Sequence, residues 1–298
     1  MYYNLLNGRT AEDFNEFKSL FYKNKSEIYG THDWIADRAI NILNDHFPND
    51  HLVNSIFSNF DNMKVFYLYG TEFPDRLINP FKNVEIKTNY GTKLTEKNFY
   101  KGHSVVMLPE GCISKNNNLL FKSAESIEKA FIKNVNSKDD FQVSALYLGY
   151  ISHLIGDACF VHHIYKAPDD SIGQQAKGEI LSRTRNTPED ILWPYSMSIR
   201  NYELAKNEFN GHSLSIKKTL FYCIWHTYFG TPHNSGAFQK TFIQNWKWYS
   251  TIKIKEVNKK RDSIVYREWW RGIEVHLNLA IFYTATAINH LRNLLNKI

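Results

Sequence analysis

Apolar side chains recur every three or four residues along most of the chain, which is the spacing of amphipathic α-helices. A cap signal at Thr10 begins the first such stretch, Gly30 ends it, and Thr31 caps the next one. The pattern predicts helices over 11–29, from Thr31 onward, from about Asp50, and over 119–135, 140–158, 174–185, 197–209, 214–229, 235–250 and 267–296. The chain is therefore predicted to be mostly α-helical.

This periodicity is interrupted from Tyr69 to Asn117, where short polar stretches contain Gly, Pro and Asn. We interpret the segment as a long irregular connection. Loops of that length inside a compact domain are uncommon and are often functional.

The composition favours one helical domain over 1–298. Gly (14) and Pro (8) are scarce, which disfavours a sandwich of many short strands, and 15% aromatic residues argue against a disordered chain. Neither an internal repeat nor a linker rich in Ser, Gly or Pro divides the sequence. The three cysteines, Cys112, Cys159 and Cys223, are too few for a disulfide framework.

The sequence carries few signs of a membrane or export segment. The longest apolar candidate, 143–165, is interrupted by His and Asp, so no transmembrane helix is predicted. The first residues lack a basic region followed by an apolar one, so we expect a cytoplasmic location. The net charge of +6 is compatible with a phosphate-bearing partner or an anionic membrane surface, but it identifies neither.

Two polar residues stand out in the core-like helix predicted over 140–158. His153 and Asp157 are four positions apart, so they project from the same face on successive turns. Buried ionisable groups are costly unless they are paired or bind a metal. Imidazole and carboxylate together are a ligand set that zinc prefers.

A lone His in an apolar helix is more often a hydrogen-bonded core residue, so the hypothesis of a metal site depends on further candidates. These are His32 in Gly30-Thr31-His32, which opens a helix; Asp75 in Phe73-Pro74-Asp75, which places a carboxylate after proline in a turn; His103; His163; and the i, i+4 pair Gln175 and Glu179.

The segments that hold these residues resemble the zinc-dependent phospholipases C of bacteria, a family that includes the catalytic domain of clostridial alpha-toxin. The S1/P1 nucleases are a more distant resemblance. The matching segments are 30–35 with Ala39-Ile40, 73–75, 145–149 continuing through His153, Asp157 and His163, and 270–291. The spacing from His153 to Glu179 fits the family without a gap, whereas 76–140 and 185–262 match poorly.

The resemblance implies an all-α, phospholipase C/P1 nuclease-like domain with three zinc ions in a cleft. It assigns the first ion to Asp75, His103, His153 and Asp157, the second to His163, Gln175 and Glu179, and the third to His32 and the bridging Asp157. Asp75 is also the position proposed in the family as general base. Adjacent divalent ions neutralise phosphoryl oxygens and lower the pKa of bound water. The implied function is a metal-dependent phosphodiesterase acting on a phospholipid or another small phosphodiester.

Two features differ from the family pattern. Gln175 stands where the family has His and is a weaker zinc ligand, and no Trp precedes Trp34, although the family binds its third zinc with an N-terminal Trp. We therefore expect two to three zinc ions, with iron or manganese as alternatives that accept mixed N and O ligands. His226 or His233 is a candidate replacement ligand, although a His flanked by aromatic residues is usually structural.

These departures leave other functions open. A second hypothesis is that the family scaffold is re-used, with a degraded metal site, for a non-hydrolytic tailoring reaction on a small molecule. A non-catalytic binding protein is a third hypothesis, against which the complete first ligand set argues.

A basic stretch over 253–271 carries seven Lys and Arg residues, with Trp246, Trp248, Trp269 and Trp270 nearby. Basic residues among aromatic ones suit lipid headgroups or single-stranded nucleic acid. A solvated helix face is the simpler interpretation, and we favour it. Peripheral membrane contact remains an expectation, whereas a nucleic-acid partner is disfavoured because the segments around His32 and Asp75 resemble the lipase branch.

Overall fold

The computed structural model describes residues 31–78, 85–87, 93–95, 105–107, 113–136, 141–159, 203, 205–229 and 264–296. Its main helices are α3 (Thr31–His46), α4 (His51–Phe57), α5 (Met63–Ile78), α6 (Leu119–Asn136), α7 (Phe141–Ala158), α11 (Ile216–Phe229) and α14 (Ile264–Leu295), with a 3-10 turn, η2 (Phe60–Asn62). The strands are β1 (Glu85–Lys87), β2 (Lys93–Thr95), β3 (Val105–Met107) and β4 (Ile113–Asn118). The predicted all-α class is confirmed, because the buried core of the described residues is built from helices.

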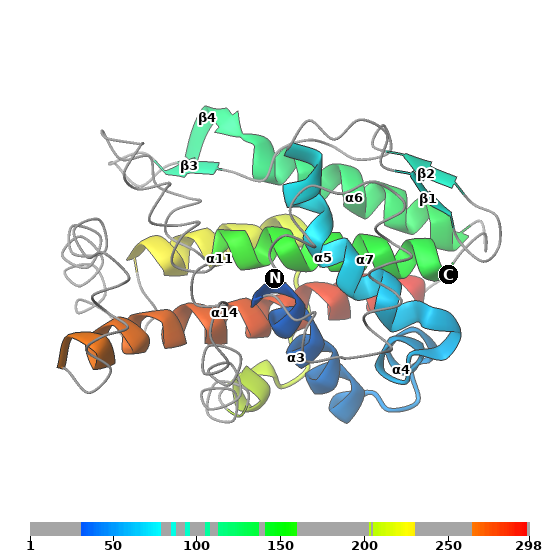
Figure 1. Cartoon of the computed structure of the whole chain (residues 1–298), viewed down its shortest axis with the longest axis horizontal. Helices are drawn as coiled ribbons and strands as arrows, with labels where there is room; N and C mark the ends of the chain where they lie inside the picture. The colour runs from blue at the N-terminus through cyan, green and yellow to red at the C-terminus, as the bar shows by residue number, and fades with distance from the viewer. Residues whose placement is uncertain are drawn as a thin grey trace, which may run out of the picture.

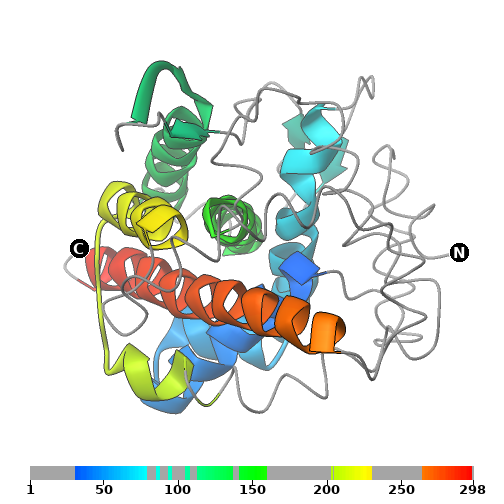
Figure 2. The same cartoon turned by 90° about the vertical axis from the view of Figure 1, so that its left-hand side faces the viewer.

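The helix α7 lies at the centre of the bundle. Figure 2 shows it nearly end-on, with α5, α6, α11, α14 and α3 around it. Every residue from Gln142 to Ala158 is buried. A helix that is apolar on all sides belongs in the middle of a protein, where each side finds an apolar neighbour. The polar residues His153 and Asp157 are therefore held inside the core.

Two glycines let α5 and α7 approach very closely. A Cβ atom added at Gly149 would lie 1.9 Å from the carbonyl oxygen of Tyr67, and one added at Gly70 would lie 2.1 Å from that of Leu146. Both distances are far below van der Waals contact, and the obstructing atoms are backbone. Only glycine on both helices permits this crossing, which the buried side chains Tyr67, Tyr69 and Phe73 then surround.

The interpretation of 69–117 as irregular is wrong for its first part. Helix α5 continues through Pro74 to Ile78, so Phe73-Pro74-Asp75 is helical and is not a turn. Proline removes one backbone hydrogen bond and disfavours the helix interior. Here the burial of Phe73 and of Pro74 itself against the core outweighs that cost.

The same segment also contains two short antiparallel hairpins. Strand β1 pairs with β2, and β3 pairs with β4, with a register irregularity between Val105 and Met107. Figure 1 shows both hairpins at the edge of the helical bundle. Three of the strands have only three residues, and the six-residue β4 is polar after Ile113, so they carry too little apolar alternation to be recognised from the sequence.

The other helices that fall on described residues agree with the predictions to within a few residues. Asp50 caps α4, since its Oδ1 accepts from the backbone N–H of Val53 at 3.1 Å. Thr31 is the first residue of α3 rather than its cap. Of 197–209, a turn at 205–209 is described as helical. The helices predicted over 11–29, 174–185 and 235–250 lie outside the described residues.

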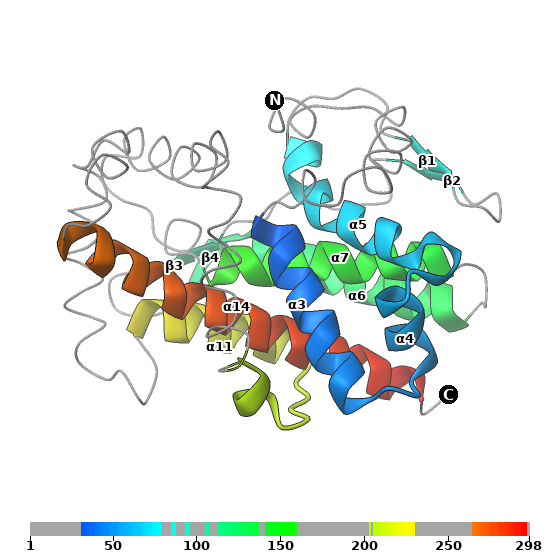
Figure 3. The same cartoon turned by 60° about the horizontal axis from the view of Figure 1, so that its bottom comes forward.

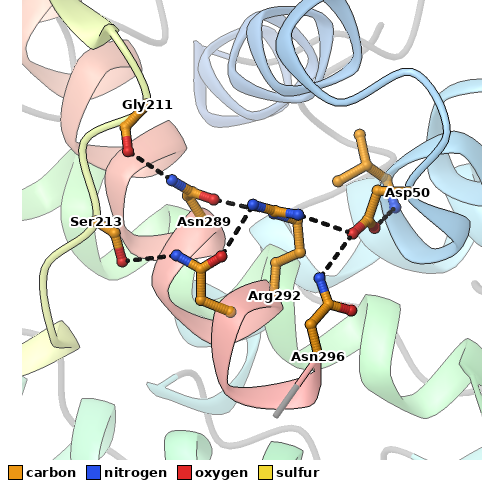
Figure 4. Close-up of polar contacts among 8 residues, drawn as sticks. Asp50, Gly211, Ser213, Asn289, Arg292 and Asn296 are labelled. Atoms are coloured by element: carbon orange, nitrogen blue, oxygen red, sulfur yellow. Dashed lines mark hydrogen bonds and ion pairs between the residues drawn. The ribbon is translucent and has the colours of Figure 1, made fainter.

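The helix α3 crosses both α7 and α14, as Figure 3 shows, so the beginning and the end of the described chain pack together. Near the end of α14, Arg292 Nη1 donates to Asp50 Oδ2 at 3.1 Å, and its guanidinium lies 3.7 Å from the ring centroid of Phe47. Asn289 donates to the carbonyls of Gly211 and His212, both at 3.0 Å. These contacts join α14 to the start of α4 and to the segment before α11, and Figure 4 shows those of Arg292 with Asp50 and of Asn289 with Gly211.

None of the helices in the described part of the chain is both long enough and apolar enough to cross a membrane.

Replacing Gly149 by Ala tests the glycine crossing. Helix propensity alone would favour Ala by about 1 kcal/mol. We nevertheless expect Gly149→Ala to lower the free energy of unfolding by about 3 kcal/mol or more, because the new methyl group meets the backbone of α5. Urea denaturation followed by circular dichroism measures the change.

Gly211→Ala is the matched control for that experiment. Gly211 has a φ of 72° and nothing within 4 Å of an added Cβ, so its cost is backbone strain of about 1 kcal/mol. Equal losses in the two variants would contradict the close crossing.

Candidate metal centre

Three of the predicted ligands converge where the first turn of α3 meets the last turns of α7. His32 Nε2 lies 3.5 Å from Asp157 Oδ1, and His153 Nε2 lies 3.2 Å from Asp157 Oδ2. The ligand atoms of all three lie within 4.8 Å of one another, and among the described residues they form the one such group of three. Each oxygen of Asp157 therefore faces a different imidazole.

The tautomer of His153 follows from its second nitrogen. His153 Nδ1 lies 2.6 Å from the backbone carbonyl oxygen of Thr71, and because a carbonyl only accepts, Nδ1 carries the hydrogen. The Nε2 atom of the neutral ring then presents a lone pair to the carboxylate of Asp157. Two acceptors at 3.2 Å repel each other unless a cation, either a proton or a metal ion, lies between them.

The contact to Thr71 is itself supported from α3. The Thr71 hydroxyl shares its hydrogen between two acceptors, Asp33 Oδ1 at 2.5 Å and the carbonyl oxygen of Leu68 at 2.7 Å. Asp33 is buried and directly follows His32 in α3. When the second ring nitrogen of a metal-binding His donates a hydrogen bond to a carbonyl, that bond fixes the orientation of the ring. Asp33 and Thr71 thus connect the position of one imidazole to the helix that carries the other.

The position of His32 depends on a glycine of α7. A Cβ atom at Gly156 would lie 2.7 Å from His32 Nδ1 and 3.0 Å from its Cε1. The His32 ring instead stacks on that of His153, with 3.9 Å between the ring centroids and 24° between their planes. The absence of a side chain at Gly156 is what leaves room for this ring beside Asp157.

Tyr67 joins the three helices at Ser152, the residue directly before His153. Its hydroxyl donates to the carbonyl of Ala36 at 3.0 Å and lies 3.1 Å from Ser152 Oγ, so α5 contacts both α3 and α7 through one polar group. Burial raises the pKa of Tyr67 well above its usual value, so the phenol stays neutral and keeps its hydrogen. This contact fixes the relative placement of the helices that carry the ligands.

The donor set fits a zinc ion. Two ligands of one tetrahedral zinc, each about 2.1 Å from the ion, lie roughly 3.4 Å apart. The two His–Asp separations, 3.2 and 3.5 Å, are of this size. His153 and Asp157 are only 1% and 2% exposed, and burying such groups is costly unless a cation compensates the carboxylate.

The remaining predicted ligands are not part of this described cluster. Asp75 belongs to α5, one helical turn after Thr71, so the two positions share a helix face. His103, His163, Gln175 and Glu179 lie outside the described residues, as does His233. The prediction for them stays open.

His226, a candidate replacement ligand, has a different role. Its Nδ1 lies 2.5 Å from the hydroxyl of Tyr283, and burial lowers the pKa of the imidazole. The imidazole therefore favours its neutral form, hydrogen-bonded with the Tyr283 hydroxyl, whose pKa burial raises. This pair between α11 and α14 supports the interpretation of His226 as a structural residue.

Three contributors to the site were missed by reasoning from the sequence: Asp33, Thr71 and Gly156. Asp33 and Gly156 each directly neighbour a predicted ligand in the sequence. Thr71 acts chiefly through its backbone carbonyl, and no sequence pattern indicates which carbonyl will face a given imidazole.

Comparison with known protein families gives a match that covers most of this chain. The family described as zinc dependent phospholipase C matches residues 31–271, which is well over half of the chain and includes every candidate ligand. Comparison with curated proteins and with solved structures gives no match.

Gly156→Ala tests whether His32 is a zinc ligand. The added methyl group must displace the His32 ring, which is a movable side chain, so the fold is retained. We expect zinc affinity to fall by about tenfold or more, measured by competition with a chromogenic chelator. Gly211→Ala, whose methyl group meets nothing within 4 Å, should bind zinc as the wild type does. Unchanged affinity in Gly156→Ala would argue against His32 as a ligand.

Thr71→Val tests the support of His153. Valine keeps the shape but removes the hydroxyl that contacts Asp33, so we expect a loss of about 1–3 kcal/mol in the free energy of unfolding. Zinc affinity should fall as well, because the Thr71 carbonyl loses its anchor. Thr71→Ser retains the hydroxyl and should recover most of both quantities. A stable Thr71→Val protein with wild-type zinc affinity would show that the contact does not orient His153.

Proposed function

The chain belongs to the zinc-dependent phospholipase C family, and we propose that it is a metal-dependent hydrolase of phosphodiesters of the phospholipase C type. Its proposed substrate is a phospholipid or a related small phosphodiester. The observation that carries the proposal is the group formed by His32, His153 and Asp157, in which the two oxygens of a buried carboxylate face the Nε2 atoms of two stacked imidazoles.

The arrangement favours a metal over a simple buried hydrogen bond. A lone His–Asp pair needs one donor hydrogen between its partners, but His153 already uses its Nδ1 hydrogen on Thr71. A proton on Nε2 would make a charged imidazolium that is stacked on a second imidazole. Divalent ions held here, with Asp157 bridging from one oxygen toward His32 and from the other toward His153, would supply the missing positive charge.

In this proposal the residues of the chain hold the metal and orient its ligands. Asp157 uses both oxygens toward the imidazoles, so it acts as a ligand and not as a base. His153 keeps its Nδ1 hydrogen on Thr71 and therefore takes no proton at that atom. Zinc bound at this position would neutralise phosphoryl oxygens and lower the pKa of a bound water. The proton that hydrolysis releases must then go to another group.

Asp75 is the proposed acceptor of that proton. The resemblance to the family assigns it this role, and its position one turn after Thr71 on α5 supports the assignment, because the Thr71 carbonyl contacts His153. We further propose that His103, His163, Gln175 and Glu179 complete a cluster of two to three ions. Zinc is the proposed metal, and iron or manganese is the alternative that Gln175 suggests.

Metal content and hydrolysis measured together test the proposal. We expect wild-type protein purified without chelator or added metal to contain zinc by elemental mass spectrometry. Asp157→Ala should lose zinc and lower the hydrolysis of a water-soluble chromogenic phosphodiester by about a hundredfold or more, because it removes the carboxylate that faces both imidazoles. Asp45→Ala is the matched control, since it removes an exposed carboxylate whose partner is Lys206.

Full hydrolysis in Asp157→Ala would contradict the proposal. Zinc without hydrolysis of any phosphodiester, in both the wild type and Gln175→His, would favour the re-use of the scaffold for a non-hydrolytic reaction. The absence of bound metal from the wild type would favour a non-catalytic binding protein.

A further inference from the structure

The outward side of α11 is aromatic where a surface helix is ordinarily polar. Its inward residues Leu220, Cys223 and Ile224 are buried, and successive residues step by about 100° around the helix. On the opposite side, Phe221 is 45% exposed, and Tyr222 and Trp225 are each 42% exposed. We call Lys217, Lys218, Phe221, Tyr222 and Trp225 the α11 outer face.

The three aromatic rings form a continuous group. The rings of Phe221 and Trp225 are stacked, with 6.0 Å between centroids and 25° between planes, and Phe221 lies edge-on to Tyr222 at 6.0 Å. Large apolar side chains gathered on a surface indicate an interaction site more strongly than scattered ones do. Trp and Tyr in particular suit the boundary between lipid and water, where one part of each ring system is apolar and another is polar.

Two lysines lie beside these rings at the N-terminal end of α11, where a positive charge does not stabilise the helix. Lys217 and Lys218 are exposed and lie in the first turn of α11, where the helix dipole favours acidic residues. The ion pair between Lys217 and Glu125 spans 3.6 Å, and both side chains are well exposed, so it contributes little. The lysines are therefore better explained by a negatively charged partner than by the stability of the helix.

The outer face lies near the end of α7 that carries the candidate metal centre. The Cys223 thiol hydrogen-bonds with the thiol of Cys159, which is two residues beyond Asp157. The exposed rings of Phe221 and Trp225 flank Cys223 in the sequence and project from the other side of the same turns. Figure 1 shows α11 running alongside α7, and Figure 2 shows it on the outside of the bundle.

We propose that the α11 outer face docks the protein on a phospholipid surface that contains anionic headgroups. The inference rests on the proposed function, in which phospholipid is a substrate. The aromatic rings would enter the interfacial layer while Lys217 and Lys218 meet the phosphates, and the chain's net charge of +6 adds a favourable long-range attraction. A second copy of the chain would bring its own lysines to the same patch, whereas anionic headgroups complement the charge.

Vesicle binding of the whole chain tests the proposal independently of catalysis. Sedimentation with vesicles of phosphatidylcholine, with and without phosphatidylglycerol, measures the bound fraction. We expect the wild type to bind the anionic vesicles more strongly than the neutral ones. The affinity of Phe221→Ala/Trp225→Ala for the anionic vesicles should be lower than that of the wild type by about tenfold or more. Lys217→Gln/Lys218→Gln should lose about tenfold on the anionic vesicles only.

Phe57→Ala/Phe60→Ala is the matched control. Those rings are 43% and 66% exposed and belong to α4 and η2, where Gln142 at the start of α7 donates to the carbonyl of Asp61 at 2.6 Å; this end of α7 is about 24 Å along the helix from Asp157. This variant should bind vesicles as the wild type does. The α11 variants should keep wild-type hydrolysis of a water-soluble phosphodiester, so a failed docking proposal is distinguishable from a failed catalytic one.

Three results would overturn the proposal. The wild type binds neither kind of vesicle; the Phe221→Ala/Trp225→Ala variant binds like the wild type; or light scattering shows a wild-type dimer that this variant dissociates, which would make the face a contact between copies of the chain.

Discussion

The crossing of α5 and α7 at Gly70 and Gly149 sets the distance on which the candidate metal centre depends. A backbone carbonyl reaches an imidazole on a neighbouring helix only if the two helices approach closely, and Thr71 O lies 2.6 Å from His153 Nδ1. A residue with a side chain at either glycine would separate the helices. The Thr71 carbonyl would then move away from His153, and the orientation of the His153 ring would change. The orientation of this candidate metal ligand therefore depends on the packing of the two glycines.

The candidate centre also shows how a bundle retains charged groups in its middle. Asp157 lies in a helix that is buried on every side, where an uncompensated carboxylate is costly. Two imidazoles supply partners for its two oxygens, and the contact between Asp33 and Thr71 extends the network into α3 and α5. Such a network is stable only when each member has its counterpart. A divalent cation would complete it, and this need agrees with the zinc dependence of the family to which the chain belongs.

Contacts outside the centre hold the surrounding helices in place. Arg292 joins the end of α14 to Asp50 at the start of α4, and Tyr67 joins α5 to α3 and α7. The proposed docking face uses α11, whose outward side is aromatic, next to the end of α7 that carries Asp157. Ligand geometry and access to a lipid surface would then both depend on how α11 and α7 pack.

The sequence by itself determined the helices with clear periodicity, α3, α4, α6, α7, α11 and α14, because their apolar spacing and caps are local properties. It also identified His32, His153 and Asp157, since an imidazole or a carboxylate is conspicuous in an apolar helix or a matching segment. Tertiary packing decided the rest. It carried α5 through Pro74 by burying Phe73, it chose the Thr71 carbonyl as the partner of His153, and it made Gly156 the space for the His32 ring. Each of these depends on the distance between helices, which no local pattern encodes.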